Sequence, residues 1–162
     1  PEAKAWVMQN VSYGMQTRVV FQCRSRFWKQ EGLSINISPG HSALYNVWEC
    51  ATEIAGNRGI LMASAQPGTT RPQAMEAFRA HYPGKAIDIE HVFIKDWFRE
   101  AWSPVCERHE FQVGQLAKFW PNIIQPAGRI HFAGSGIDNN HHGMEAATRS
   151  AHRVARQIDE AS

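Results

Sequence analysis

One stretch near the C-terminus, residues 128–158, constrains the fold more than any other. Arg129–Ala133 is short and apolar, with one β-branched and one aromatic residue, which predicts a buried strand. Gly134–Gly136 then allows a tight turn. From Gly143 the pattern becomes helical, with apolar residues at steps of three and four: Ala147, Ala151, Val154 and Ile158. A strand, a glycine turn and a helix with free first amides together form a place where an anion or an electron-rich ring edge can bind.

Composition places the chain among ordinary globular proteins. Its 162 residues are 43% hydrophobic and 20% charged, with a formal net charge of +2, so charge predicts neither a nucleic-acid nor a membrane partner. No apolar run approaches the roughly 18 residues that cross a bilayer. The three cysteines, Cys23, Cys50 and Cys106, are odd in number and widely spaced, which favours free thiols in a reducing compartment, and we expect the cytoplasm.

The order of predicted elements indicates a mixed α+β fold rather than a regular βαβ winding. Thr70 and Gln73 match a capping box at the start of one helix, which Pro83-Gly84 ends. Hydrophobic periodicity predicts helices over 2–11, 70–82 and from 143 onward, strands over 17–23, 43–50, 59–65, 86–97 and 129–133, alternation over 33–37, and an irregular segment over 98–118.

A family resemblance arises at the C-terminal stretch. Gly128-Arg-Ile-His-Phe-Ala-Gly134, a polar loop and Gly143-Met-Glu-Ala-Ala147 resemble the C-terminal signature of the FAD-dependent amine oxidases, which include monoamine, polyamine and L-amino acid oxidases. Tyr13-Gly14 and Phe27-Trp28 resemble the substrate domain of that family more loosely. The resemblance implies that residues 1–118 are part of a substrate-binding domain of mixed or antiparallel sheet with helices, and that 119–162 are the last segment of an FAD-binding domain.

The same resemblance implies positions for the cofactor. Gly134 and Ser135 are expected near the ribityl and pyrophosphate part of FAD. Gly143, Met144 and Glu145 are expected under the pyrimidine edge of the flavin, where their amides and the helix dipole would stabilise negative charge. The competing interpretation, from pattern alone, is an ordinary strand–turn–helix corner with glycines for packing.

Candidate substrate contacts are His141, His142 and Trp102, which the resemblance places beside the active site. A solvent-exposed loop is the alternative for the histidines. His131, Asp138 and the two loop histidines also suggest a metal cluster, but their spacing argues against one, and we expect no metal. No catalytic residue is assigned. Most of the other tryptophans are interpreted as core anchors: Trp28, Trp48, Trp97 and Trp120.

The implied function is oxidation of the C–N bond of an amine or L-amino acid, by hydride transfer to flavin N5, with an imine product and reoxidation by O2. The sequence contains no Gly-x-Gly-x-x-Gly strand–helix motif, so we expect a second polypeptide, or a part removed by processing, to carry that dinucleotide-binding fold in a homo- or hetero-oligomer. Gly136 stands where the family usually has an acid, and His141-His142 replace its usual aromatic residue. Two alternatives therefore stay open: a related desaturase or dehydrogenase, and a non-catalytic interaction subunit.

Overall fold

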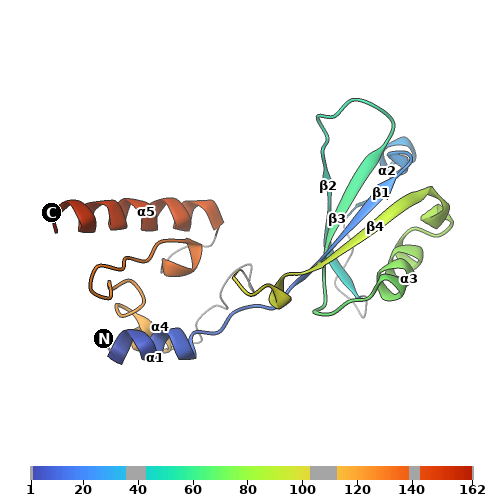
Figure 1. Cartoon of the computed structure of the whole chain (residues 1–162). Coiled ribbons are helices and arrows are strands. Elements are labelled where there is room, and N and C mark those ends of the chain that lie inside the picture. Colours follow the sequence, from blue (N-terminus) through green and yellow to red (C-terminus); the bar gives the residue numbers. More distant parts are fainter. Residues whose placement is uncertain (1, 36–42, 103–112, 139–142, 162) are drawn as a thin grey trace. The chain divides into compact units, whose positions relative to one another are not determined.

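The computed structural model describes residues 2–35, 43–102, 113–138 and 143–161, which belong to two compact units (Figure 1). One unit is Met15–Val105; the other combines Pro1–Gly14 with Cys106–Ser162. The predicted boundary at residue 118 separates substrate binding from FAD binding. Compactness does not test that division of function, so it stays a prediction.

The unit formed by residues 15–105 is built on a four-stranded antiparallel sheet in the order β2-β3-β1-β4. The four strands predicted within this unit are present, the first and third with the expected bounds. The strands are β1 (Thr17–Cys23), β2 (Leu44–Cys50), β3 (Gly59–Ala65) and β4 (Ile89–Asp96). Side chains alternate in burial along β1, because successive residues of a strand point to opposite faces.

One face of this sheet is sealed by α3 (Arg71–His81) and the short helix α2 (Phe27–Gln30). The Phe78 ring lies 4.8 Å from that of Phe21 on β1 and 5.1 Å from that of Tyr82, measured between ring centroids. The predicted capping box of α3 is present: the Thr70 amide donates to the Gln73 side chain at 2.9 Å. Hydrophobic burial on this face holds the unit together.

Two local features adjust the sheet to this core. Asn46 has a left-handed backbone, with φ of 49°, where the pairing of β2 with β3 shifts register. Gly59 opens β3 directly against Trp28, and a Cβ at this position would come within 2.4 Å of the indole ring. Only glycine lets the chain pass the buried tryptophan so closely.

The second unit is mainly helical and contains α1 (Glu2–Asn10), α4 (Leu116–Phe119), the 3₁₀ turn η3 (Ser135–Ile137) and α5 (Gly143–Asp159). Val7, Phe119 and Ile123 form its small core. Lys4 is buried beside them: its ammonium donates to the carbonyl of Ile123 at 2.5 Å and lies 3.8 Å from the centroid of the Phe132 ring. Burial, with Arg153 nearby, lowers the pKa of Lys4.

The predicted strand over residues 129–133 is wrong. Only an isolated bridge joins Ala127 to Ile130, which is a turn, and Ile130 is exposed. A strand needs a neighbour for its backbone groups, and the described residues offer none there. Instead, the Phe132 carbonyl accepts a hydrogen bond from the Arg153 guanidinium at 3.1 Å.

The predicted helix from Gly143 is present, but its buried face is not the expected apolar one. Ala146 and Ser150 are buried, whereas Ala151 and Ile158 are exposed. The helix packs against the turn at residues 134–137 through the face that carries Ala146 and Ser150, and the face with Ala151 and Ile158 stays exposed.

Three other segments complete the comparison. Strand β4 starts three residues later than expected, because residues 85–88 form the 3₁₀ turn η1 (Lys85–Asp88), and η2 (Trp97–Arg99) follows β4. The alternation over 33–37 and the irregular segment 98–118 lie partly outside the described residues. No helix in the described part of the chain is both long and apolar enough to cross a bilayer.

Candidate functional site

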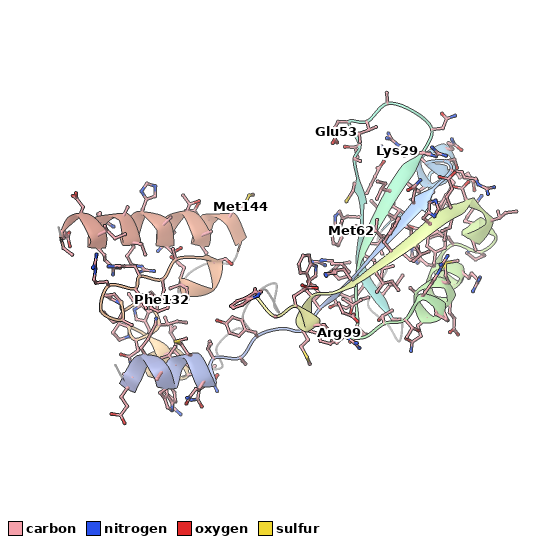
Figure 2. The ribbon with its side chains drawn as sticks, in the orientation of Figure 1. Lys29, Glu53, Met62, Arg99, Phe132 and Met144 are labelled. Atoms are coloured by element: carbon pink, nitrogen blue, oxygen red, sulfur yellow. The ribbon has the colours of Figure 1, made fainter. Side chains whose placement is uncertain are left out.

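The predicted cofactor corner lies where the turn after residue 133 meets α5 in the helical unit (Figures 1 and 2). The Gly134 amide donates to the Ser150 hydroxyl at 2.8 Å, and that hydroxyl donates to the Ala147 carbonyl at 2.8 Å. The Gly134 carbonyl accepts from the Ile137 amide at 3.0 Å, closing η3. One buried serine thus ties the turn to the second turn of the helix.

The two glycines of this corner have backbones that other residues rarely adopt. Gly134 has φ of 141° and Gly143 has φ of 77°. A Cβ built on either meets no described atom within 4 Å, so neither glycine is needed for close packing against the described residues. The corner therefore has the bare backbone and open space that a flat cofactor needs, and in this respect the residues fit FAD.

The first turn of α5 supplies the polar part of the corner. Its first four amides have no acceptor within the helix, and they carry the positive end of the helix dipole. Met144 is 88% exposed and Glu145 is exposed as well. By contrast, the Gly134 amide is already used by Ser150, so any contact of that residue with a phosphate would not come from its N–H.

The predicted substrate contacts are only partly visible. His141 and His142 lie outside the described residues. Trp102 lies in the sheet-containing unit and is 98% exposed, so it does not pack against the described residues of that unit. Their assignment to a substrate cavity stays a prediction.

Of the residues considered for a metal, His141 and His142 lie outside the described residues, and the other two have partners of their own. Asp138 is buried and accepts from the Arg149 guanidinium at 3.2 Å. The His131 ring lies 3.3 Å from the Gln157 side chain. Among the described residues, no three His, Cys, Asp or Glu side chains are grouped as a metal would require.

The outer face of the sheet carries a feature that the sequence interpretation missed. Trp48 pairs with Met62, Met62 with Val20, and Val20 with Phe93, so one apolar residue from each strand forms a row across all four (Figure 2 labels Met62). We call these four residues the outer row. Phe93 is 57% exposed and the others are only half-buried. Alternation along β1 signals that Val20 faces away from the core, but the row itself depends on register across three strand pairs.

Arg18 adds positive charge beside this row. Its guanidinium lies 5.1 Å from the Trp48 ring centroid, a cation–π arrangement, and it donates to the Ser64 hydroxyl. Gln16 also donates to Ser64, at 3.3 Å. An aromatic surface next to a guanidinium suits a molecule with an apolar body and a carboxylate.

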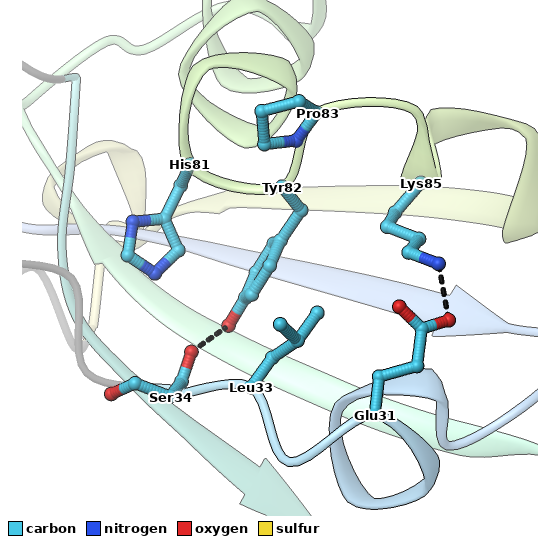
Figure 3. Close-up of a pocket in the computed structure, with 7 residues that line it drawn as sticks. All are labelled: Glu31, Leu33, Ser34, His81, Tyr82, Pro83 and Lys85. Carbon is cyan, nitrogen blue, oxygen red and sulfur yellow. Dashed lines mark hydrogen bonds and ion pairs between the residues drawn. The ribbon is translucent and has the colours of Figure 1, made fainter.

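A separate hollow of about 290 Å³ lies at the end of α3 (Figure 3). The Tyr82 hydroxyl donates to the Ser34 carbonyl at 3.1 Å across it, and Lys85 forms an ion pair with Glu31 at its rim. Burial raises the pKa of Tyr82 to about 12. Burial, together with the charges of Asp88 and Glu90, raises the pKa of Cys23 to about 12. Neither group ionises at neutral pH, so neither supplies a nucleophile there.

Comparison with known proteins gives a match over nearly the whole chain. The profile of one protein family, described as flavin containing amine oxidoreductase, matches residues 1–159. The flavin-dependent L-tryptophan oxidase RebO of Lentzea aerocolonigenes is 24% identical over an alignment of 176 residues. That alignment covers 96% of this chain and 37% of that protein. The flavin-containing amine oxidase A of Equus caballus is 35% identical over 75 residues, covering 46% of this chain and 14% of that protein.

Solved structures show the same fold. A putrescine oxidase bound to putrescine superposes with a TM-score of 0.82 and 22% identity, over 99% of this chain and 38% of the other. Cyclohexylamine oxidase from Brevibacterium oxydans superposes with a TM-score of 0.77 and 18% identity, over 98% and 39%. The chain thus spans less than two-fifths of the length of these relatives.

Proposed function

This chain belongs to the family of flavin-containing amine oxidoreductases, whose cofactor is FAD, and from that membership we propose that it is the C-terminal portion or a subunit of an FAD-dependent oxidase. The proposed substrate is an amine or an L-amino acid, oxidised at its C–N bond. The family match over residues 1–159 carries the proposal. The open backbone at Gly134 and Gly143 supports it, because the described residues leave space there for a flat cofactor.

The FAD, when bound, supplies a two-electron oxidation of the substrate to an imine, with O2 as the final acceptor and peroxide as its product. The residues of this chain would hold the cofactor and stabilise negative charge on its ring. Amides at the start of α5, near Met144 and Glu145, would face the electron-rich edge of the ring. A helix start stabilises negative charge by about 0.3–1 kcal/mol when exposed and up to about 2 kcal/mol when partly buried.

The outer row is proposed as the wall that receives the apolar part of the substrate. The opposite face of the sheet is sealed by α3, so only this face is open among the described residues. Arg18 beside Trp48 would attract a carboxylate and repel an ammonium group. This charge favours an amino acid over a simple amine, which supports the amino-acid alternative of the proposal.

The proposal is tested by peroxide release from the natively purified protein, together with everything that co-purifies with it. The relatives suggest a panel: L-tryptophan, putrescine and cyclohexylamine. We expect a yellow protein that releases peroxide with L-tryptophan in air and reacts more slowly with the two amines. Substrate-dependent bleaching of the flavin without peroxide would instead identify a desaturase or dehydrogenase, and a colourless protein would identify an interaction subunit.

We also propose that the missing dinucleotide-binding fold is supplied by a second polypeptide or by further sequence of the same protein. The support is coverage, because the relatives are more than twice as long as the matched region. The intact mass of the purified assembly distinguishes these possibilities. A single species of this chain alone that still holds FAD would contradict the proposal.

A further inference from the structure

One face of α5 carries three arginines and one histidine. Arg149, Arg153 and Arg156 are separated by four and three residues, and His152 lies three residues after Arg149 and four before Arg156, so all four lie on one side of the helix. Like charges at these spacings destabilise a helix. The carboxylate of Asp138 is the acid that lines the same region.

The three arginines are used differently. Arg153 is structural: its guanidinium donates to the carbonyls of Ile124, Phe132 and Ile137 at 3.1, 3.1 and 3.3 Å. Arg149 forms an ion pair with Asp138 at 3.2 Å. In the described part of the chain, no acceptor pairs with the guanidinium of Arg156, which lies one turn further along. That guanidinium is available to a ligand.

These side chains enclose a cavity. It has a volume of about 330 Å³, at the lower end of the range for small-molecule sites, and it belongs entirely to the helical unit. Its wall carries three guanidinium groups against one carboxylate, and a concave wall of one sign concentrates counter-ions. The lining residues are Trp120, Asp138, Arg149, His152, Arg153 and Arg156.

We propose that this cavity binds a small oxyanion, a phosphate or carboxylate group, chiefly through Arg156, with Arg153 one turn away and Arg149 two turns away adding positive charge to its wall. Planar guanidinium groups match the oxygens of such anions in pairs. The half-buried Trp120 ring gives the site an apolar wall, so an anion with an aromatic ring binds better than the bare ion. The site is separate from the proposed flavin corner, which uses the first turn of the same helix.

The test is calorimetric titration of the flavin-loaded protein with inorganic phosphate, phenyl phosphate and benzoate. We expect saturable binding, with phenyl phosphate tighter than inorganic phosphate, and an unchanged flavin spectrum. The affinity for benzoate, compared with that for phenyl phosphate, shows whether the site prefers a carboxylate or a phosphate. Release of flavin by the added phosphate would overturn the proposal, since the anion would then be competing for the cofactor's own site.

Arg156→Gln should weaken phosphate binding about tenfold or more, since it removes a charged hydrogen-bonding group. Arg156→Lys keeps the positive charge but loses the planar guanidinium, so its phosphate affinity should lie between those of the wild type and Arg156→Gln. The matched control is Arg79→Gln, which removes an exposed arginine from α3 in the other unit and should leave binding unchanged. Thermal unfolding checks that all variants fold. Absence of saturable binding in the wild type, or equal affinity in the wild type and Arg156→Gln, would contradict the site.

Discussion

Ser150 occupies a position where one side chain joins two parts of the cofactor corner. It is 1% exposed, accepts the Gly134 amide and donates to the Ala147 carbonyl. Ser150→Ala leaves the half-buried Gly134 amide without its acceptor, so we expect a loss of about 0.5–1.5 kcal/mol in the free energy of unfolding. Urea denaturation measures it. Thr148→Ala is the control, because that exposed hydroxyl contacts only the Met144 carbonyl of its own helix; equal losses in both variants would refute the tie.

Cys23 makes stability depend on pH in the alkaline range. Its pKa is raised from 9.0 to about 12 in the folded protein, chiefly by burial. The folded state therefore keeps a proton that the unfolded state releases, and the stabilisation is present below pH 9 and is lost as pH rises towards 12. One group contributes at most about 1.4 kcal/mol per pH unit. Cys23→Ala should flatten the fall in unfolding free energy between pH 9 and 10.5, and Cys50→Ala, at a half-buried position, should not; a parallel fall in Cys23→Ala would contradict this origin.

At the scale of elements, the two faces of the sheet have opposite roles. Phe78 on α3 fills the sealed face, whereas Phe93 lies on the open face. Phe78→Ala should cost about 3–5 kcal/mol of unfolding free energy, and Phe93→Ala well under half as much. If the outer row contacts substrate, Phe93→Ala should instead raise KM for an aromatic amino acid several-fold. Equal stability losses, or an unchanged KM, would count against this division.

Helices and strands were predictable where residues close together in the sequence determine them. Strands β1 and β3 were predictable to the residue, because β1 is rich in β-branched and aromatic residues and β3 is a continuous apolar run that starts at a glycine turn. Helix α3 was predictable from its capping box and Pro83-Gly84. The strand predicted over 129–133 failed because a strand also needs a partner, which composition does not reveal. The cofactor corner was inferred from family resemblance and stays a prediction, whereas the outer row was not foreseen, since it arises only when strand register brings distant residues together.

At the scale of the whole molecule, the two units carry complementary parts of one proposed activity. The sheet-containing unit offers an apolar surface with a guanidinium beside it, and the helical unit offers a glycine corner at a helix start. The chain matches a flavoenzyme family over residues 1–159 yet spans less than two-fifths of its relatives. The proposed FAD site and substrate cavity would therefore need further protein to complete them.

Flavin content after substitution at Gly143 tests this account most directly. Gly143→Val places a branched side chain at a residue with φ of 77° and fills the space proposed for the flavin edge. Gly56→Val is the matched control, because Gly56 also has positive φ and open space but lies in the loop between β2 and β3. In the natively purified assembly, we expect the flavin-to-protein ratio, measured by visible absorbance, to fall about tenfold or more for Gly143→Val and to stay at the wild-type value for Gly56→Val. A folded Gly143→Val protein with full flavin content and an unshifted spectrum would contradict the assignment of this corner to FAD.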